Sequence, residues 1–478
     1  MSETYNIGTG HCTPAILDVA PILFQGVLSV TAVKLTCVTL RGAVQLKNLH
    51  PLNTLILTNN QFTEFPRELC ADIPLLEELI VTKQQIDTLS SSSFSNITDR
   101  LEELILPFND LKFIELQAFA TFYRLEKLDI RSNRLEVLRS GTFAGLGNLT
   151  SLNLGDNRLR EIAPGTFSGL QKLRIINLED NALESLSDTT FNNLISLEEI
   201  KLYGNALKIP QEFCVDSPKL EYLIVRYQHI RTLSPASFAR MNTEVLKELL
   251  LEFNGLESVE PQTFARFRHL KILDLSDNSL EILRRGVFGG LDELEKLWVV
   301  NNSLRHVEPG IFSGLKNLRL LDLRDNRLTT LPSGIFDELK HLEKLELFGN
   351  AITAVTGSLL QATHELSYLS LGFSERIQIE PNAFQGLSLN FFLLNGDQMN
   401  YLSAGAFGGL TTEVVWLRRK SILNFKPNLF ENLTITIGFV LYEPEVTLVD
   451  RKSWGLDSKI VLRSNPLYMF GDEKTHLY

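Results

Sequence analysis

Leucine and other aliphatic residues recur along the chain in a pattern that repeats every 24 residues. Three consecutive segments show it: LEELILPFNDLKFIELQAF from Leu101, LEKLDIRSNRLEVLRSGTF from Leu125 and LTSLNLGDNRLREIAPGTF from Leu149. They share the template LxxLxLxxNxLxxLxxxxFxxLxx. We identify 18 such units, the last one truncated, which begin at positions 52, 76, 101, 125, 149, 173, 197, 220, 246, 270, 294, 318, 342, 366, 389, 412, 436 and 457. A fixed period of this length indicates a repeat protein, in which each unit packs only against its neighbours.

Each position of the template has a physical role. The LxLxx part predicts a short β-strand, because alternate side chains of a strand point to opposite faces. Residues such as Leu128 and Ile130 then face the core, and positions three, five, seven and eight face solvent. The asparagine at position nine can bond backbone groups of adjacent units through its amide. It recurs at Asn60, Asn109, Asn133, Asn157, Asn181, Asn205, Asn254, Asn278, Asn302, Asn326, Asn350 and Asn465. An aromatic residue at position nineteen is expected to pack the opposite side of the core, at Phe94, Phe119, Phe143, Phe167, Phe191, Phe238, Phe264, Phe288, Phe312, Phe336, Phe384, Phe407 and Phe430.

This template resembles the typical 24-residue class of leucine-rich repeats, which is found mostly in extracellular proteins. Toll-like receptor ectodomains, Slit, chaoptin and vertebrate variable lymphocyte receptors are similar. The resemblance covers about residues 50–478 and implies an α/β solenoid: a horseshoe with a parallel β-sheet on its concave face. It says little about function, because function depends on the variable positions of such a scaffold.

The regularity of the units divides the chain into three parts. Residues 1–51 are expected to form an N-terminal cap, 52–365 the regular repeats and 366–478 divergent repeats with no recognisable C-terminal cap. In the divergent part, the asparagine of position nine, which we call the ladder asparagine, is replaced by Ser374, Asp397, Lys420 and Pro444. Arg376 stands where the template has a leucine. We expect these units to be less regular.

Charge and hydropathy exclude several classes of function. The 46 basic and 57 acidic residues give a net charge of −11, which argues against nucleic acid as a partner, because phosphates require a basic surface. No uncharged apolar stretch is long enough to predict a membrane span. The first residues, MSETYNIGTGHC, show no signal peptide.

The four cysteines and four sequons bear on the compartment. Cys70 occupies position nineteen, and so does Cys214 once a one-residue deletion in its unit is allowed. The two lie six units apart, too far for a disulfide, so we expect buried thiols. Extracellular proteins of the class that the chain resembles close their N-terminal end with a disulfide-bonded cap. That resemblance implies a Cys12–Cys37 bridge, although the usual cluster of four cysteines is absent. The sequons lie at Asn96, Asn148, Asn301 and Asn432. Together these features favour an extracellular, glycosylated protein.

Two segments of the chain match each other, also at positions that the repeat template does not fix. Pro66–Leu89 and Pro210–Leu233 are identical at 14 of 24 positions, including a glutamine at position nine, Gln84 and Gln228. The simplest explanation is a six-unit block copied in tandem. The alternative is repeated selection for one local shape. The shared glutamine indicates a local adjustment of the turn.

Most of the solvent-facing strand positions are polar, but two groups of units carry apolar residues there. The first group is Ile56, Ile80, Ile105 and Phe108. The second is Tyr203, Tyr222, Ile224, Tyr227, Leu250 and Phe253. Exposed apolar and aromatic surface tends to mark an interface, so we predict that both groups bind a protein partner on the concave face. The alternative is that β-branched and aromatic residues simply suit strands.

Charged residues follow in the next units, at Asp274, Asp277, Asp322, Arg324, Asp325 and Glu346. Such a row is usually a solvated face; the functional alternative is electrostatic steering of a basic partner. Trp298 and Trp416 are further candidate anchors for a partner. We expect acidic residues on this scaffold to face solvent, without the burial that would shift their pKa values.

No nucleotide-binding, zinc-protease or nucleophile-elbow motif is found, and the eight histidines show no metal-ligand spacing. The sequence therefore predicts no catalytic residue, cofactor or metal. It favours a non-enzymatic, secreted or cell-surface scaffold for protein binding in adhesion, matrix or receptor-type recognition, of unknown oligomeric state. Two alternatives remain: a non-catalytic subunit of a secreted enzyme, since some such subunits are similar repeat proteins, and a truncated innate-immune receptor ectodomain.

Overall fold

The computed structural model describes the backbone of most of the chain. The described residues are 4–8, 15–17, 32–36, 38–40, 52–66, 73–95, 97, 99–207, 217–357, 359–380, 382–395, 402–418, 427–442, 455–456 and 461–464. They divide into two compact units. Unit 1 comprises Met1–Ile230 and Ala236–Leu249, and unit 2 comprises Arg231–Pro235 and Leu250–Tyr478.

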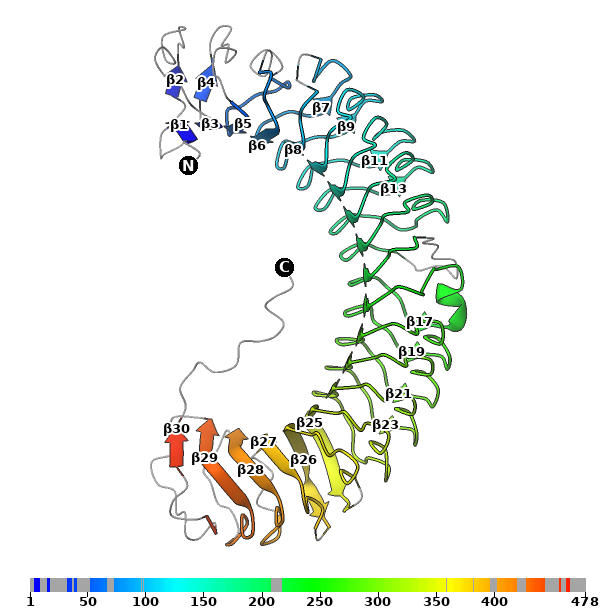
Figure 1. Ribbon diagram of the computed structural model, residues 1–478, viewed down its shortest axis with the longest axis vertical. Helices are drawn as coiled ribbons and strands as arrows, with labels where there is room; N and C mark the ends of the chain where they lie inside the picture. Colours follow the sequence, from blue (N-terminus) through cyan, green and yellow to red (C-terminus); the bar gives the residue numbers. More distant parts are fainter. Residues whose placement is uncertain are drawn as a thin grey trace. The chain divides into compact units, whose positions relative to one another are not determined.

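Unit 1 is built on a parallel sheet with one strand per repeat (Figure 1). In order across the sheet, its strands are β1 (Thr4–Gly8), β3 (Ala32–Thr36), β5 (Thr54–Thr58), β6 (Glu78–Thr82), β8 (Glu103–Ile105), β10 (Lys127–Asp129), β12 (Ser151–Asn153), β14 (Ile175–Asn177), β15 (Glu199–Lys201) and β16 (Tyr222–Ile224). Short parallel pairs accompany it: β2 (Ala15–Leu17) with β4 (Val38–Leu40), β7 (Thr88–Leu89) with β9 (Phe113–Ile114), and β11 (Val137–Leu138) with β13 (Glu161–Ile162).

Unit 2 has a parallel sheet of the same kind (Figure 1). Its strands are, in order, β20 (Ile272–Asp274), β22 (Lys296–Trp298), β24 (Leu320–Asp322), β25 (Lys344–Val355), β26 (Tyr368–Ile379), β27 (Ser388–Asn395), β28 (Thr411–Arg418), β29 (Thr434–Tyr442) and β30 (Val461–Ser464). The short pairs are β17 (Thr232–Leu233) with β19 (Ser258–Val259) and β21 (Ile282–Leu283) with β23 (His306–Val307). Strand β18 (Glu248–Leu250) has residues in both units.

The repeats stack with equivalent positions in register. Leu104, Leu128 and Leu152 are opposite one another on three neighbouring strands and are fully buried. Positions three and five point to the other side of each sheet, which we call the open face. On the far side of the core, the rings of Phe119, Phe143 and Phe167 stack with centroids 6.2 and 6.0 Å apart. The core positions predicted from the template are therefore confirmed.

The asparagine of position nine joins neighbouring repeats. Asn133 Nδ2 donates to the carbonyls of Leu106 (2.9 Å) and Ile130 (2.9 Å), and its Oδ1 accepts the N–H of Asn109 (2.9 Å). In the two matching segments a buried glutamine does the same. Gln84 Nε2 donates to Leu57 and Thr82, and Gln228 Nε2 donates to Leu202 and Arg226. The longer side chain of glutamine keeps the contact with the preceding repeat.

The segments that return to the next strand are turns. Typical backbone bonds there join Ala144 N to Gly141 O (3.0 Å) and Leu146 N to Phe143 O (3.3 Å). Within the described residues the only helix is a four-residue 3-10 helix, η2 (Pro235–Phe238). The predicted solenoid with a parallel sheet is confirmed, and turns rather than α-helices connect the strands that the structure describes.

The strands lengthen toward the end of unit 2. Strands β25 to β29 contain 8 to 12 residues, whereas β20, β22 and β24 contain three each. Strand β26 runs through Ser374 and Arg376, where regular repeats turn away at the ladder asparagine. The lengthening begins at β25, one repeat before the divergent part expected from position 366. Asp397, Lys420 and Pro444 lie outside the described residues.

Candidate binding face of the sheet

The first predicted apolar group forms a continuous row in unit 1. Ile56, Ile80 and Ile105 are opposite one another on β5, β6 and β8, and all three are half-buried on the open face. Lys34 precedes this row and Asp129 follows it in the same register. The structure therefore brings the three isoleucines together as the sequence predicts, with a charged residue at each end.

Phe108 lies directly after this row, at position eight. Its side chain is 52% exposed, and its backbone has a φ of 60°. Position eight adopts this left-handed conformation in other repeats too, where it is Asn59, Ser132 or Asp156. Such a φ is uncommon outside glycine, asparagine and aspartate, and a bulky side chain there costs on the order of 1–3 kcal/mol.

Two other repeats carry an exposed aromatic residue at the same strained position. Tyr227 in unit 1 has a φ of 54° and is 51% exposed, and Phe253 in unit 2 has a φ of 57° and is 42% exposed. None of the three aromatics lies within a strand. The alternative explanation by strand propensity therefore does not apply to them, although it still applies to the isoleucines.

The second predicted group is divided between the units. Tyr203, Tyr222, Ile224 and Tyr227 belong to unit 1, and Ile224 is opposite Lys201 on β15. Leu250 and Phe253 belong to unit 2. The expectation that Leu250 faces solvent is wrong, because its side chain is only 5% exposed. Asp274 and Asp322, also at position five, are buried too, whereas Trp298 between them is half-buried.

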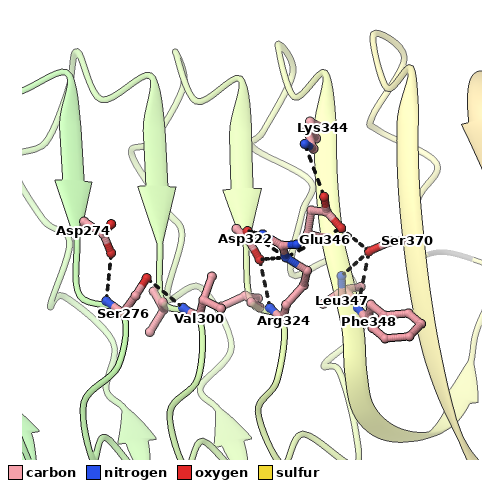
Figure 2. Close-up of polar contacts among 12 residues, drawn as sticks. Asp274, Ser276, Val300, Asp322, Arg324, Lys344, Glu346, Leu347, Phe348 and Ser370 are labelled. Carbon is pink, nitrogen blue, oxygen red and sulfur yellow. Dashed lines mark hydrogen bonds and ion pairs between the residues drawn. The ribbon is translucent and has the colours of Figure 1, made fainter. Parts of the chain in front are cut away.

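The acidic row in unit 2 is also more buried than expected. Position five reads Asp274, Trp298, Asp322, Glu346 and Ser370 on β20, β22, β24, β25 and β26. Asp274, Asp322 and Glu346 are buried, so the expectation that they face solvent is wrong. Their carboxylates bind local donors (Figure 2). Asp277 and Asp325, at position eight, do reach the surface.

Each buried carboxylate of β24 and β25 has cationic and neutral donors around it (Figure 2). The Arg324 guanidinium donates to both oxygens of Asp322 at 2.7–3.0 Å, and its Nε lies 3.9 Å from Glu346. Glu346 accepts a hydrogen bond from Ser370 Oγ (2.5 Å) and pairs with Lys344 Nζ (3.3 Å). Ser370 Oγ in turn accepts the backbone N–H groups of Leu347 and Phe348.

Two lysines of unit 2 lie over aromatic rings. Lys344 Nζ is 4.7 Å from the centroid of the Tyr368 ring, and Lys296 Nζ is 5.9 Å from that of Trp298. Burial, together with the negative charge of Glu346, raises the pKa of the Tyr368 hydroxyl well above its usual range, so that this group stays protonated. Lys344, Tyr368 and Ser370 were not identified as site residues from the sequence. The signal that could have found Lys344 and Tyr368 is the row of position-three residues that they form with Phe391.

A recurrent contact explains the acidic or amide residues at position five. The side-chain oxygens of Asp129, Asn153 and Asn177 accept the backbone N–H of position seven at 3.1, 3.0 and 2.9 Å. Burial raises the pKa of the Asp129 carboxyl above its ordinary value, although the N–H and the charge of Arg131 act in the opposite direction. Because a raised pKa favours the protonated form, the folded chain gains stability as pH falls through that pKa and loses it as pH rises.

Asp129→Asn is therefore expected to raise the midpoint temperature of unfolding at pH 7 by a few degrees, because asparagine keeps the backbone contact without a buried charge. The advantage should shrink as pH falls, because the raised pKa of the wild-type carboxyl lets it take up its proton. Thermal melts of both chains between pH 3.5 and 8 test this, with exposed Asp156→Asn as the matched control. A lower midpoint at pH 7, or a difference that does not change with pH, would contradict the expectation.

The predicted glycosylation sites differ in their surroundings. Asn432 is exposed with a φ of 61°, and Asn301 is exposed while its Nδ2 donates to Asp277 (2.7 Å). Asn148 is half-buried, and its Nδ2 donates to the carbonyl of Tyr123 (2.5 Å). Asn96 and the four cysteines, including Cys12 and Cys37, lie outside the described residues. Their predicted roles stay predictions.

The described residues contain no group of three or more histidine, cysteine, aspartate or glutamate side chains that could hold a metal ion. They also contain no helix that is long and apolar enough to cross a membrane.

Comparison with known proteins identifies the class of repeat. The leucine rich repeat family model matches residues 99–159, 123–183, 147–207, 171–223, 244–300 and 292–352. No curated protein matches the chain. The chain is a leucine-rich-repeat protein.

Several solved structures share the fold at low sequence identity. The chain in the TLR13–ssRNA13 complex is 22% identical, with a TM-score of 0.67 over 87% of this chain and 66% of that one. The chain in the Drosophila Toll–Spatzle complex is 18% identical, with a TM-score of 0.63 over 93% of this chain and 70% of that one. A leucine-rich-repeat protein of Leptospira interrogans is 24% identical, with a TM-score of 0.57 over 73% of this chain and 85% of that one. At these identities the likeness concerns the fold alone.

Proposed function

We propose that this chain is a non-enzymatic scaffold, secreted or at the cell surface, that binds a protein ligand on the open face of its sheet in adhesion, matrix or receptor-type recognition. One observation carries the proposal: Phe108, Tyr227 and Phe253 are exposed aromatic residues held at a left-handed position that glycine or asparagine would occupy with less strain. Strain of this kind persists where it serves recognition. Aromatic side chains are also the most frequent hot-spot residues of interfaces.

Other observations support parts of the proposal. The isoleucine row of β5, β6 and β8 extends the apolar surface beside Phe108. Asn301 and Asn432 are exposed sequons, which suits a glycosylated extracellular protein. Among the solved relatives, one is a complex with Spatzle and another with single-stranded RNA. The net charge of −11 favours a protein over RNA as the ligand here. Leucine-rich-repeat folds are in general interaction scaffolds without catalysis.

The triple variant Phe108→Asn, Tyr227→Asn and Phe253→Asn is expected to lose the ligand while folding normally. Each asparagine relieves backbone strain, which offsets the apolar burial that it removes, so the free energy of unfolding should stay within about 1 kcal/mol per site of the wild-type value. Loss of hot-spot aromatics should weaken binding by more than about thirtyfold. Pull-down from native tissue fluid, followed by mass spectrometry and chemical denaturation, measures both effects.

Phe113→Asn is the matched control, because Phe113 is 61% exposed but lies in the separate β7–β9 pair. It should leave the captured proteins unchanged. Identical profiles for the triple variant and the wild type would refute the aromatic site. A captured protein with enzymatic activity of its own would instead favour the role of a non-catalytic subunit.

A further inference from the structure

A second surface lies on the open face of unit 2, in repeats that carry none of the left-handed aromatics. At position three, Lys344, Tyr368 and Phe391 are opposite one another on β25, β26 and β27. At position five, Leu393, Trp416 and Val440 are opposite one another on β27, β28 and β29. We call these six residues the lysine–aromatic face. All six are half-buried, so each forms part of the floor and still reaches solvent.

The aromatic part of this face is held in place by direct contacts. The rings of Tyr368 and Phe391 lie 6.3 Å apart between centroids, and Lys344 Nζ lies 4.7 Å from the centroid of the Tyr368 ring. Strands β25, β26 and β27 pair without a register shift at these three residues. A rigid aromatic floor of this kind loses little conformational entropy when a ligand binds.

The charged residues beside the lysine–aromatic face determine whether it favours an acidic or a basic ligand. The Asp322 and Glu346 side chains are each 3% exposed, whereas Arg324 is 39% and Lys344 is 37% exposed. The carboxylates therefore lie beneath the cations and already bind Arg324, Lys344 and Ser370. A ligand that approaches this edge meets N–H donors first. A basic ligand would meet the two cations before the carboxylates, so steering of a basic partner by Asp322 and Glu346 is disfavoured.

We propose that the lysine–aromatic face binds an acidic, apolar segment of a partner protein. Its carboxylate binds at Lys344 and Arg324, and its aliphatic or aromatic side chains pack on Tyr368, Phe391 and Trp416. This inference rests on the proposed protein-binding function and adds to it a second surface and the chemistry of its ligand. Lysine has three N–H donors and arginine five, which leaves donors for a ligand beyond those that bind Glu346 and Asp322. Charge-assisted bonds at an exposed edge make the affinity depend on salt.

Selection from a display library of random 12-residue peptides against the full chain tests the proposal. Enriched peptides are expected to carry aspartate or glutamate next to leucine, phenylalanine or tryptophan. The most enriched peptide, synthesised with a fluorescent label, should bind the wild type more weakly as NaCl is raised. It should bind the Lys344→Gln/Trp416→Thr variant at least tenfold more weakly by fluorescence anisotropy.

Two controls make the result specific. Lys296→Gln removes the equivalent lysine of β22, which covers Trp298 outside this face, and should leave the affinity unchanged. The Phe108→Asn, Tyr227→Asn and Phe253→Asn variant should also bind the peptide normally, which separates this proposal from the first. Thermal melts verify that every variant is folded.

Three results would overturn the inference. The enriched peptides could be basic, the affinity could be insensitive to Lys344→Gln/Trp416→Thr, or no peptide could be enriched. A peptide that loses affinity only in the Phe108, Tyr227 and Phe253 variant would overturn this inference while supporting the proposed function.

Discussion

Replacing Phe143 by alanine is expected to lower the free energy of unfolding of unit 1 by about 3–5 kcal/mol. The ring is fully buried and stacks between those of Phe119 and Phe167 at 6.2 and 6.0 Å. Its removal leaves a cavity and breaks two aromatic contacts at once. Because each repeat is stabilised mainly by its neighbours, the damage should spread to both adjacent repeats.

Urea denaturation followed by circular dichroism measures the loss, and hydrogen exchange locates it. The matched control is Phe113→Ala, which removes the same side chain from the same unit at a site that is 61% exposed. The control should lower the free energy of unfolding by about 1 kcal/mol or less. Similar losses for the two variants would mean that the stacked phenylalanines are not the core of the return segments.

Gly290→Ala is expected to destabilise unit 2 by about 3–5 kcal/mol, the sum of backbone strain and a steric clash. Gly290 has a φ of +88°, which side-chain-bearing residues rarely adopt. A Cβ there would meet the backbone of Ala265 in the preceding repeat, at 2.5 Å from its oxygen and 2.7 Å from its Cα. Backbone atoms cannot move aside as a flexible side chain can, so the two repeats would have to separate.

Gly314→Ala separates the two causes. Gly314 occupies the same template position with a φ of +93°, but nothing lies within 4 Å of its added Cβ. Only the conformational cost remains, about 1–2 kcal/mol. Chemical denaturation of both variants should rank Gly290→Ala as the more harmful. Equal losses would contradict the close approach of the two repeats.

The repeat pattern predicted the fold because it is a local signal that recurs many times. Leu104, Leu128 and Leu152 had to be buried together, since stacked units of equal length place equal positions in register. Asn133 and Gln84 were correctly assigned to the contacts between repeats, because an amide has both a donor and an acceptor. The isoleucine row of Ile56, Ile80 and Ile105 followed from the same register.

The candidate surfaces were harder to predict because exposure depends on the neighbouring repeats. The alternation of strand positions predicts that Leu250 and Glu346 face away from the core, yet both are buried. Burial at position five varies along the sheet, and the Glu346 carboxylate can be buried there because Arg324, Lys344 and Ser370 surround it. The aromatic residues Phe108, Tyr227 and Phe253 do not themselves indicate a left-handed backbone. The only signal is the asparagine, aspartate or glycine that other repeats carry at the same position.

The sequence by itself determined the leucine-rich-repeat class, the parallel register, the phenylalanine core and the ladder of amides. Each of these follows from the spacing of a few residue types within a single repeat. Tertiary structure alone decided which residues of the open face a partner would meet. Phe108 projects from a strained turn, and the cations Arg324 and Lys344 cover the carboxylates Asp322 and Glu346. Burial and charge pairing are set by side chains one or two repeats away, which no single repeat contains.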